Sequence, residues 1–242
     1  MKKLLKLTLF VCFTLLLVQC SDNEDNTEQD PTTLTDIYGN VYNTIKIGNQ
    51  KWMLENLKTT KFNDGTPITE FSFAEFGINW LNLNTPTAFY QWANTDDLNN
   101  AVEQELPFDY YGAMYNHLAI ESGKLAPEGW RIPSEQDFIE LENYLTNNGY
   151  AGNEATALKS DSGWLASSEN GTNAIGFKGL PNGYVSAFGT PTFSEGICSW
   201  LTTDVNTTTQ TRRMVQLYNE SAILYSDNGI QLGAGIRCIK NN

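Results

Sequence analysis

SEQDFIELENYLTN, residues 134–147, carries the strongest helix signal in the chain. Ser134 is a favourable N-cap, and Glu135 and Asp137 place negative charge in the first turn, where the helix dipole stabilises it. Apolar residues then recur at helical spacing, at positions 138, 141 and 145. Gly149 supplies a stop just beyond. The pattern predicts one main helix that buries a single face.

Strands are expected on both sides of this helix. Residues 34–38, 41–47 and 51–55 alternate or are bounded by Gly-Asn turns, which predicts a three-stranded meander. A shorter helix is expected over 154–159, capped by Asn153. Beyond Gly163, short strands are expected at 176–180, 183–187, 197–202, 212–218, 223–225 and 235–239. Strands, then helices, then strands indicate an α+β domain rather than an alternating α/β sheet.

Two long stretches have little periodicity, residues 60–108 and 186–212. Both are rich in Asn, Thr and aromatic residues, and Asp64-Gly65-Thr66-Pro67 is a turn signal in the first. Residues 88–92 are either a strand or a short helix. We expect residues 60–108 to be a long ordered loop or a cap over the core. Ordered loops of this size usually carry function, so both stretches are candidate binding surfaces.

The first 33 residues are expected to be a targeting signal followed by a tether. Lys2, Lys3 and Lys6 precede an apolar run that is too short to span a bilayer and ends near Cys20. The pattern predicts a lipoprotein signal peptide over residues 1–19, with acyl chains on Cys20. Gln19 departs from the small residue usual before the cysteine, so an ordinary signal peptide cleaved nearby is the alternative.

Residues 20–33 are acidic, lack an apolar period and are expected to be a disordered tether, with the domain spanning 34–242. A small polar residue and then acidic residues follow Cys20. This arrangement resembles the export signal that sends lipoproteins of the Bacteroidetes group to the outer face of the outer membrane. It implies a lipid-anchored protein that faces the cell exterior.

The charge of the chain excludes some partners. After removal of residues 1–19, twelve basic residues remain against 28 acidic ones, a net charge of about −16. Such a surface opposes nucleic acid and anionic lipid headgroups. No Cys/His cluster has zinc spacing, and no cofactor is expected. Asn94-Thr95-Asp96-Asp97 and Glu220, Asp227 and Asn228 could ligate a structural calcium, but no metal site is assigned.

Two cysteines belong to the mature domain, Cys198 and Cys238. An exported protein meets an oxidising compartment, so a disulfide between them is possible. The alternative is two buried thiols, since a free cysteine packs as a small hydrophobe. The sequence leaves both open.

No residue set predicts catalysis. His117 is the only histidine, and a single one is a poor basis for nucleophilic chemistry. Glycoside hydrolysis needs two facing carboxylates. The acidic residues of the main helix are more simply explained by capping and a solvated helix face. Trp52, Trp130, Arg131, Trp164 and Trp200 are expected to be scaffold.

Six motifs in the same order resemble the Fibrobacter succinogenes major paralogous domain family, over about residues 36–240. They are IGNQKWMLENL (47–57), YGAMYN (111–116), LAPEGWRIPS (125–134), ALKSDSGW (157–164), GFKGLPNGY (176–184) and GIRCIK (235–240). Two positions depart from the family: His117 stands where members often have Trp, and SWLTT (199–203) replaces a Trp-Ser-Ser segment.

The resemblance implies a C-type lectin-like fold, with short twisted antiparallel strands, one main helix, long loops and neighbouring termini. It implies no settled activity. GWRIPS and GIRC also resemble motifs of the formylglycine-generating enzymes, whose chemistry needs a close copper-binding cysteine pair; Cys198 and Cys238 lie on separate expected strands, which opposes that activity.

Together these features predict a cell-surface lipoprotein that carries a non-catalytic binding or adhesion domain. The expected ligand is a glycan or a surface protein, and the expected membrane contact is the lipid anchor. The alternatives are an enzyme acting on extracellular polysaccharide and a structural surface component.

Overall fold

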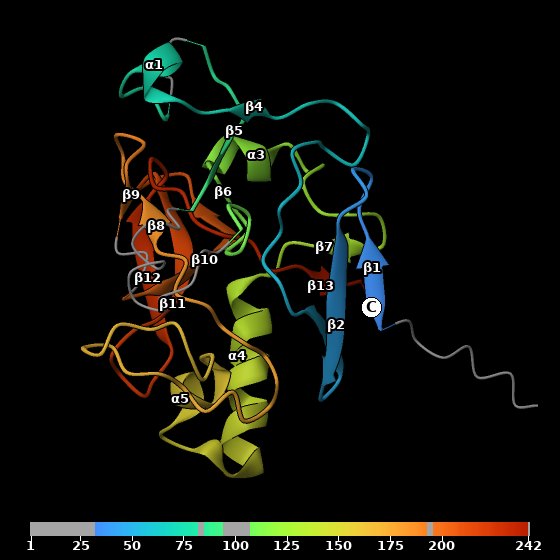
Figure 1. The fold of residues 1–242 in the computed structure, drawn as a ribbon, viewed down its shortest axis with the longest axis vertical. Helices are drawn as coiled ribbons and strands as arrows, with labels where there is room; N and C mark the ends of the chain where they lie inside the picture. Colours follow the sequence, from blue (N-terminus) through green and yellow to red (C-terminus); the bar gives the residue numbers. More distant parts are fainter. Residues whose placement is uncertain (1–31, 82–84, 94–106, 193–195, 242) are drawn as a thin grey trace, which may run out of the picture. The chain divides into compact units, whose positions relative to one another are not determined.

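The first three strands form the predicted meander. β1 (Thr33–Thr35), β2 (Val41–Ile47) and β3 (Gln50–Met53) are antiparallel neighbours. β13 (Ile239–Lys240) pairs with β3, and β7 (Trp130–Arg131) pairs with β13, so the first and last strands belong to one sheet (Figure 1). The computed structural model describes residues 32–81, 85–93, 107–192 and 196–241. Within them, β1 starts one residue before the expected boundary at 34.

A second antiparallel sheet follows later in the chain, in the order β10-β11-β12. β10 (Cys198–Asn206), β11 (Thr211–Leu217) and β12 (Leu224–Gly229) lie where strands were predicted, but β10 and β12 run further. The expectation of a long loop over 186–212 is therefore wrong. Most of its described part is β9 (Pro191–Thr192), which pairs with β8 (Tyr184–Val185), and the β10–β11 hairpin.

The described part of 60–108 is a cap with its own core. β5 (Phe89–Trp92) is a strand, parallel to β4 (Thr69–Glu70) and antiparallel to β6 (Ala113–Tyr115). The short helices α1 (Phe73–Phe76) and α3 (His117–Glu121) flank these strands. Beneath them lies a buried cluster that contains Phe71, Trp80, Phe89, Ala93, Tyr111, Met114 and Val185.

Two predicted strands are wrong. Residues 176–180 are irregular, since Gly176 and Lys178 have φ angles of 74° and 55°, which a strand excludes; only Gly179 bridges to Lys159. In residues 235–239, only Ile239 belongs to a strand. The carbonyl groups before it bond to two different segments. The Gly235 carbonyl accepts from Leu201 N, and the Ile236 carbonyl accepts from Leu57 N.

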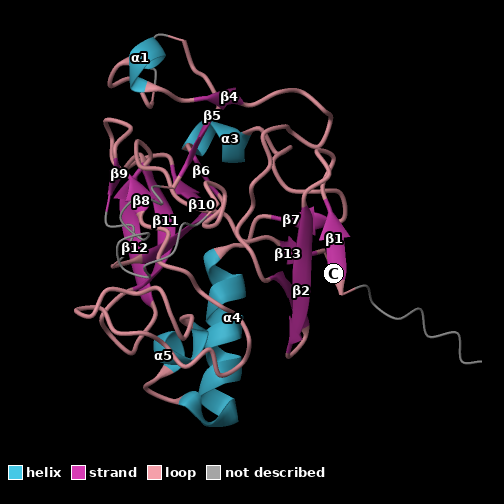
Figure 2. Cartoon of the chain, in the orientation of Figure 1, coloured by secondary structure: helices cyan, strands magenta, loops and turns pink. Residues whose placement is uncertain are grey.

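The main helix, α4 (Glu135–Leu145), begins as predicted (Figure 2). Ser134 and Asp137 form a capping box, in which each side chain accepts from the other residue's backbone N–H. Phe138 lies 5.0 Å from the ring of Trp52 in the first sheet and 5.8 Å from that of Trp200 in the second. One aromatic side chain of α4 therefore joins the two sheets.

Beyond α4, one turn of π-helix (Thr146–Tyr150) contains Gly149, whose φ of 94° ends the helical path. α5 (Glu154–Leu158) follows after Asn153. Asn153 occupies the predicted N-cap position, but the predicted capping hydrogen bond is wrong, because its side chain makes none. The buried carboxylate of Glu154 instead accepts from Thr146 Oγ1 and Gly152 N. The mixed architecture confirms the α+β class.

Asp137→Asn is expected to lower the free energy of unfolding by about 2 kcal/mol at pH 7. The Asp137 carboxylate accepts two bonds from Arg131, at 2.6 and 2.7 Å, as well as Ser134 N and Oγ, and charge-assisted bidentate bonds are the strong kind. Burial raises the pKa of Asp137, but these bonds outweigh it and the net pKa is lowered.

A carboxyl whose folded pKa is depressed stabilises the fold above its unfolded pKa of about 3.9 and loses that contribution as pH falls. Urea denaturation at pH 7 and pH 3 measures this. The difference between wild type and Asp137→Asn should shrink at the lower pH, whereas Glu140→Gln, an exposed position on the same helix, should change little at either. A constant difference at both pH values would contradict the role of the ionised carboxylate.

Candidate functional site

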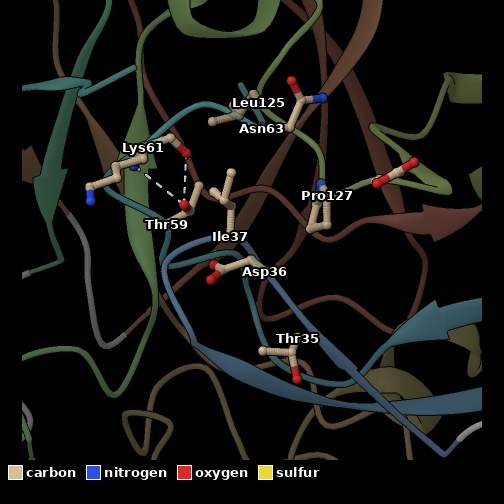
Figure 3. Close-up of a pocket in the computed structure, with 9 residues that line it drawn as sticks. Thr35, Asp36, Ile37, Thr59, Lys61, Asn63, Leu125 and Pro127 are labelled. Carbon is tan, nitrogen blue, oxygen red and sulfur yellow. Dashed lines mark hydrogen bonds between the residues drawn. The ribbon is translucent and has the colours of Figure 1, made fainter. Parts of the chain in front are cut away.

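Two neighbouring pockets lie beside the loop that leads into β7. One has a volume of about 240 Å³ and the other about 300 Å³, and both are lined by Asn63 and Leu125. Figure 3 shows the first, with Ile37, Thr59, Leu125 and Pro127 around its opening. We call the two together the paired pockets. Three segments far apart in the sequence build them, residues 35–37, 59–63 and 120–132, with Thr203 of β10 at one edge.

The turn after β1 forms one wall, and Asp36 holds it. One Asp36 carboxylate oxygen accepts from the backbone N–H groups of Tyr38 and Asn40, and the other from Asn40 Nδ2 and Tyr42 Oη. Gly39, with φ 94°, donates its N–H to the Asp36 carbonyl. Burial raises the pKa of Tyr42, and the nearby Asp36 charge adds to this. The turn leaves Ile37 56% exposed at the pocket.

The second wall is residues 59–67. Thr59 Oγ1 donates to the Lys61 carbonyl and accepts from Lys61 N, as Figure 3 shows. The predicted turn at 64–67 forms, closed by the Phe62 N bond to the Thr66 carbonyl at 2.9 Å. Asp64 accepts from Thr66 and from Lys124 Nζ, and these bonds hold its pKa well below the usual range.

Asn63 connects this wall to the loop opposite. Its backbone N donates to the Lys124 carbonyl at 2.8 Å, and its Nδ2 donates to the Ala126 carbonyl at 3.1 Å. The side-chain oxygen of Asn63 accepts no hydrogen bond from the residues that the structure describes, so an acceptor remains free on a side chain that lines both pockets. Asn63 therefore joins two walls of the paired pockets and lines both of them.

The second pocket is lined by β7 and the end of α3. Trp130 is half-buried against the core and presents its remaining surface to the pocket, beside Ile132. Arg131 also lines it, but its guanidinium is held by Asp137. Trp130 and Arg131 therefore serve the scaffold, as predicted, and also border the pocket, which the sequence did not indicate.

Charged groups at the paired pockets are mostly committed to internal bonds. Asp36 accepts four hydrogen bonds, which use the lone pairs a substrate proton would need. Arg131 pairs with Asp137, and Lys61 Nζ lies 5.0 Å from the centre of the Tyr38 ring. What remains at the surface is an apolar face with amide and hydroxyl groups, together with the exposed Glu128. This arrangement suits binding of a neutral polar ligand.

The two domain cysteines do not line the paired pockets, and each packs in a different buried hydrophobic cluster. Cys198 and Cys238 are free thiols and both are fully buried; Cys198 is the first residue of β10, and Cys238 lies immediately before β13. Burial raises the pKa of both thiols, which keeps them protonated. They correspond to the expected alternative of two packed cysteines rather than to a bridge.

His117 is 7% exposed and lies outside the paired pockets. Its Nδ1 is 3.3 Å from Glu121 Oε1 but makes no hydrogen bond to the residues that the structure describes; Arg212 Nη2 donates to that same oxygen at 3.2 Å. The acidic residues of α4 are likewise engaged: Glu135 pairs with Arg213, and Glu142 accepts from Tyr225 Oη. Trp52, Trp164 and Trp200 are buried, as expected of scaffold.

The suggested calcium ligands divide into two groups. Residues 94–97 and the lipidation site Cys20 lie outside the described residues. Within the described ranges, Glu220, Asp227 and Asn228 belong to no cluster of three or more His, Cys, Asp or Glu side chains that could hold a metal ion. Nor does any helix in those ranges have the length and apolar character to cross a membrane.

Comparison with known proteins identifies the family. The sequence profile of the Fibrobacter succinogenes major domain matches residues 45–240. No curated protein and no solved structure gives a significant match. Because the profile covers most of the chain, the protein belongs to the Fibrobacter succinogenes major domain family, as the six motifs predicted.

Proposed function

We propose that this member of the Fibrobacter succinogenes major domain family is a cell-surface lipoprotein whose domain binds a glycan at the paired pockets without catalysis. The observation that carries the proposal is the composition of the pocket walls. Apolar surface of Ile37 and Trp130 stands next to the Asn63 amide, while Asp36 and Arg131 are committed to internal bonds. Sugar rings offer apolar faces edged by hydroxyl groups, and such walls match them.

A C-type lectin-like topology is part of the proposal. It is supported by the first and last strands sharing one sheet, by a single long helix and by an irregular cap between them. The calcium-binding sequence motifs of true C-type lectins are absent from the chain. We therefore propose that binding is independent of calcium.

A glycan array tests the proposal. The chain from residue 20 to 242, carrying Cys20→Ser to keep it in solution, is applied with calcium and then with a chelator. We expect the same glycans to be bound in both conditions. Loss of binding with the chelator would contradict calcium independence, and absence of any glycan hit would contradict the proposed ligand class and favour a structural role.

Ile37→Ser and Asn63→Ala should each weaken binding of the best array glycan about tenfold, the effect of one lost contact worth ~1.4 kcal/mol. Ile37 is exposed, so its substitution costs little stability. Phe73→Ser, at an exposed apolar residue far from the pocket lining, is the matched control and should bind normally. Titration calorimetry measures all three; equal affinities for Ile37→Ser and wild type would place the glycan elsewhere.

A further inference from the structure

A second exposed surface lies on the cap, around Phe71. Phe71 is buried, and its ring is 5.5 Å from that of Phe73 and 6.0 Å from that of Phe76. The β8–β9 turn packs against the same ring: a Cβ on Gly189 would overlap Phe71 Cε1, and Gln91 Nε2 donates to the Gly189 carbonyl. Phe188, at the tip of that turn, is thus placed beside α1.

This surface is apolar and open. Phe73, Ile78 and Phe188 are 50%, 63% and 61% exposed, and no residue of α1 is buried. Figure 1 shows α1 at one end of the domain, beyond β4 and β5. Exposed apolar residues gathered in one place mark interaction sites more often than isolated ones do. We call Phe73, Ile78, Phe188 and the adjacent Glu75 the cap patch.

The charges around the cap patch have one sign. Residues 62–123 contain nine acidic residues and neither Lys nor Arg, and residues 179–211 also contain neither. β4, α1, β5, β6, β8 and β9 all fall within these two stretches. The twelve basic residues of the mature chain lie in the other parts of the sequence. None of these elements therefore contributes a Lys or Arg to the cap patch.

Glu75 gives the patch exposed negative charge. It is exposed, and its carboxylate has no ion pair with the described Lys and Arg side chains. Glu70 does not contribute, because its carboxylate accepts from Tyr90 Oη at 3.2 Å and Tyr90 packs in a different cluster from Phe71. Apolar rings beside an unpaired carboxylate complement a ligand that has both apolar and cationic side chains. Phenyl rings also attract cations over their faces.

We propose that the cap patch binds basic, apolar polypeptide segments, in which Lys or Arg residues accompany Leu or Phe. Phe73 and Phe188 contact the apolar side chains, and Glu75 attracts the cationic ones. This site is separate from the paired pockets, and its ligand differs in charge and class from the proposed glycan.

Three synthetic peptides of equal length test the proposal with the chain of residues 20–242 carrying Cys20→Ser. One has Lys and Leu in an amphipathic pattern, the second has Glu in place of Lys, and the third has Ser in place of Leu. Fluorescence anisotropy at 50 mM salt should detect binding of the first alone, and binding should weaken as salt is raised. Equal binding of the Lys/Ser peptide would show only general attraction to an acidic protein and would overturn the proposal.

Variants locate the site. Phe73→Ser and Phe188→Ser, on separate elements, should each weaken the Lys/Leu peptide at least about fivefold, the effect of losing ~1 kcal/mol at a contact residue. Val205→Ser, at an apolar residue 42% exposed on β10, is the matched control and should bind normally. Glu75→Gln should weaken binding about threefold, whereas Glu128→Gln, which changes the net charge equally, should not.

Equal affinities for Glu75→Gln and Glu128→Gln would overturn the proposal, as would unchanged affinity in both phenylalanine variants. Sedimentation velocity tests whether a second copy of this chain binds the patch instead. If wild type is a dimer and Phe73→Ser is a monomer, the patch is a dimer interface and the proposal is overturned. Ile37→Ser should bind the peptide normally and Phe73→Ser should bind the glycan normally, so failure of one proposal is distinguishable from failure of the other.

Discussion

Asn56→Leu is expected to lower the free energy of unfolding by about 3 kcal/mol or more, although the two side chains have the same branching of heavy atoms. Asn56 is 3% exposed, and its side chain connects three parts of the fold. Its Oδ1 accepts from Trp200 Nε1 at 2.8 Å and from Arg237 Nε at 3.2 Å, while its Nδ2 donates to the Tyr111 carbonyl at 2.9 Å. Each buried polar group left without its partner costs roughly 1–3 kcal/mol.

The donors that bond to Asn56 are buried, so they cannot bond to water when the amide is removed. Trp200 and Arg237 are fully buried, and the Arg237 guanidinium has no carboxylate partner among the described residues. Its charge is met instead by the carbonyls of Phe177 and Lys178 and by the ring faces of Phe177 and Trp200, at 4.7 and 5.1 Å. Without the Asn56 acceptor, the buried Arg237 cation would face an apolar side chain, which costs free energy.

Urea denaturation measures the loss, as a lower midpoint with an unchanged slope. Asn219→Leu, at an exposed residue, is the control and should stay within about 0.5 kcal/mol of wild type. Trp200→Phe removes one of the stranded donors, so in its background Asn56→Leu should cost less. A loss below about 1 kcal/mol would contradict the connecting role of Asn56.

Local signals account for what the sequence predicted correctly. α4 begins at its expected cap because the side chains of Ser134 and Asp137 each accept a hydrogen bond from the other residue's backbone N–H, and the two residues are only three positions apart. The 41–47 strand is visible because alternation is a property of the segment itself. In both cases the interactions that define the element lie inside it.

Errors arose where distant partners determine the backbone. The phenylalanine of residues 176–180 is buried as in a strand, yet Lys178 takes φ 55° with its N–H bound by Asn173 Oδ1, and Gly179 N donates to the Leu158 carbonyl. β10 runs past Thr202 because Val205 and Asn206 pair with Arg212 and Thr211. Neither partner set can be read from the segment alone.

The paired pockets were missed for the same reason. Their walls come from the turn at Asp36, the segment around Asn63 and the loop at Leu125, and none of these segments by itself shows that it meets the others. Only Lys61, Asn63 and Thr203 belong to the stretches that were predicted to bind. The useful signal is the unusual number of polar turn residues in 59–67, since a turn clamped to a second loop creates a concave surface.

Cys20→Ser is expected to release the protein from membranes almost completely. The positive start, short apolar run and terminal cysteine of residues 1–20 predict cleavage before Cys20 and acylation at its thiol. Each buried methylene of an acyl chain contributes ~0.8 kcal/mol, and more than one chain is needed for stable anchoring. Because the mature chain carries a net charge of about −16, it has no attraction to anionic lipid that could replace the anchor.

Fractionation of cells that express each variant measures this, with detergent-phase partitioning as the readout for acylation. Cys12→Ser is the matched control: Cys12 lies inside the apolar run, and its loss should leave membrane association unchanged. A Cys20→Ser protein that still sediments with membranes would contradict lipidation. The changes Asp22→Ala, Glu24→Ala and Asp25→Ala, made together, should keep the anchor but protect the protein from protease added to intact cells, because the acidic residues after Cys20 are the proposed signal for export to the outer face.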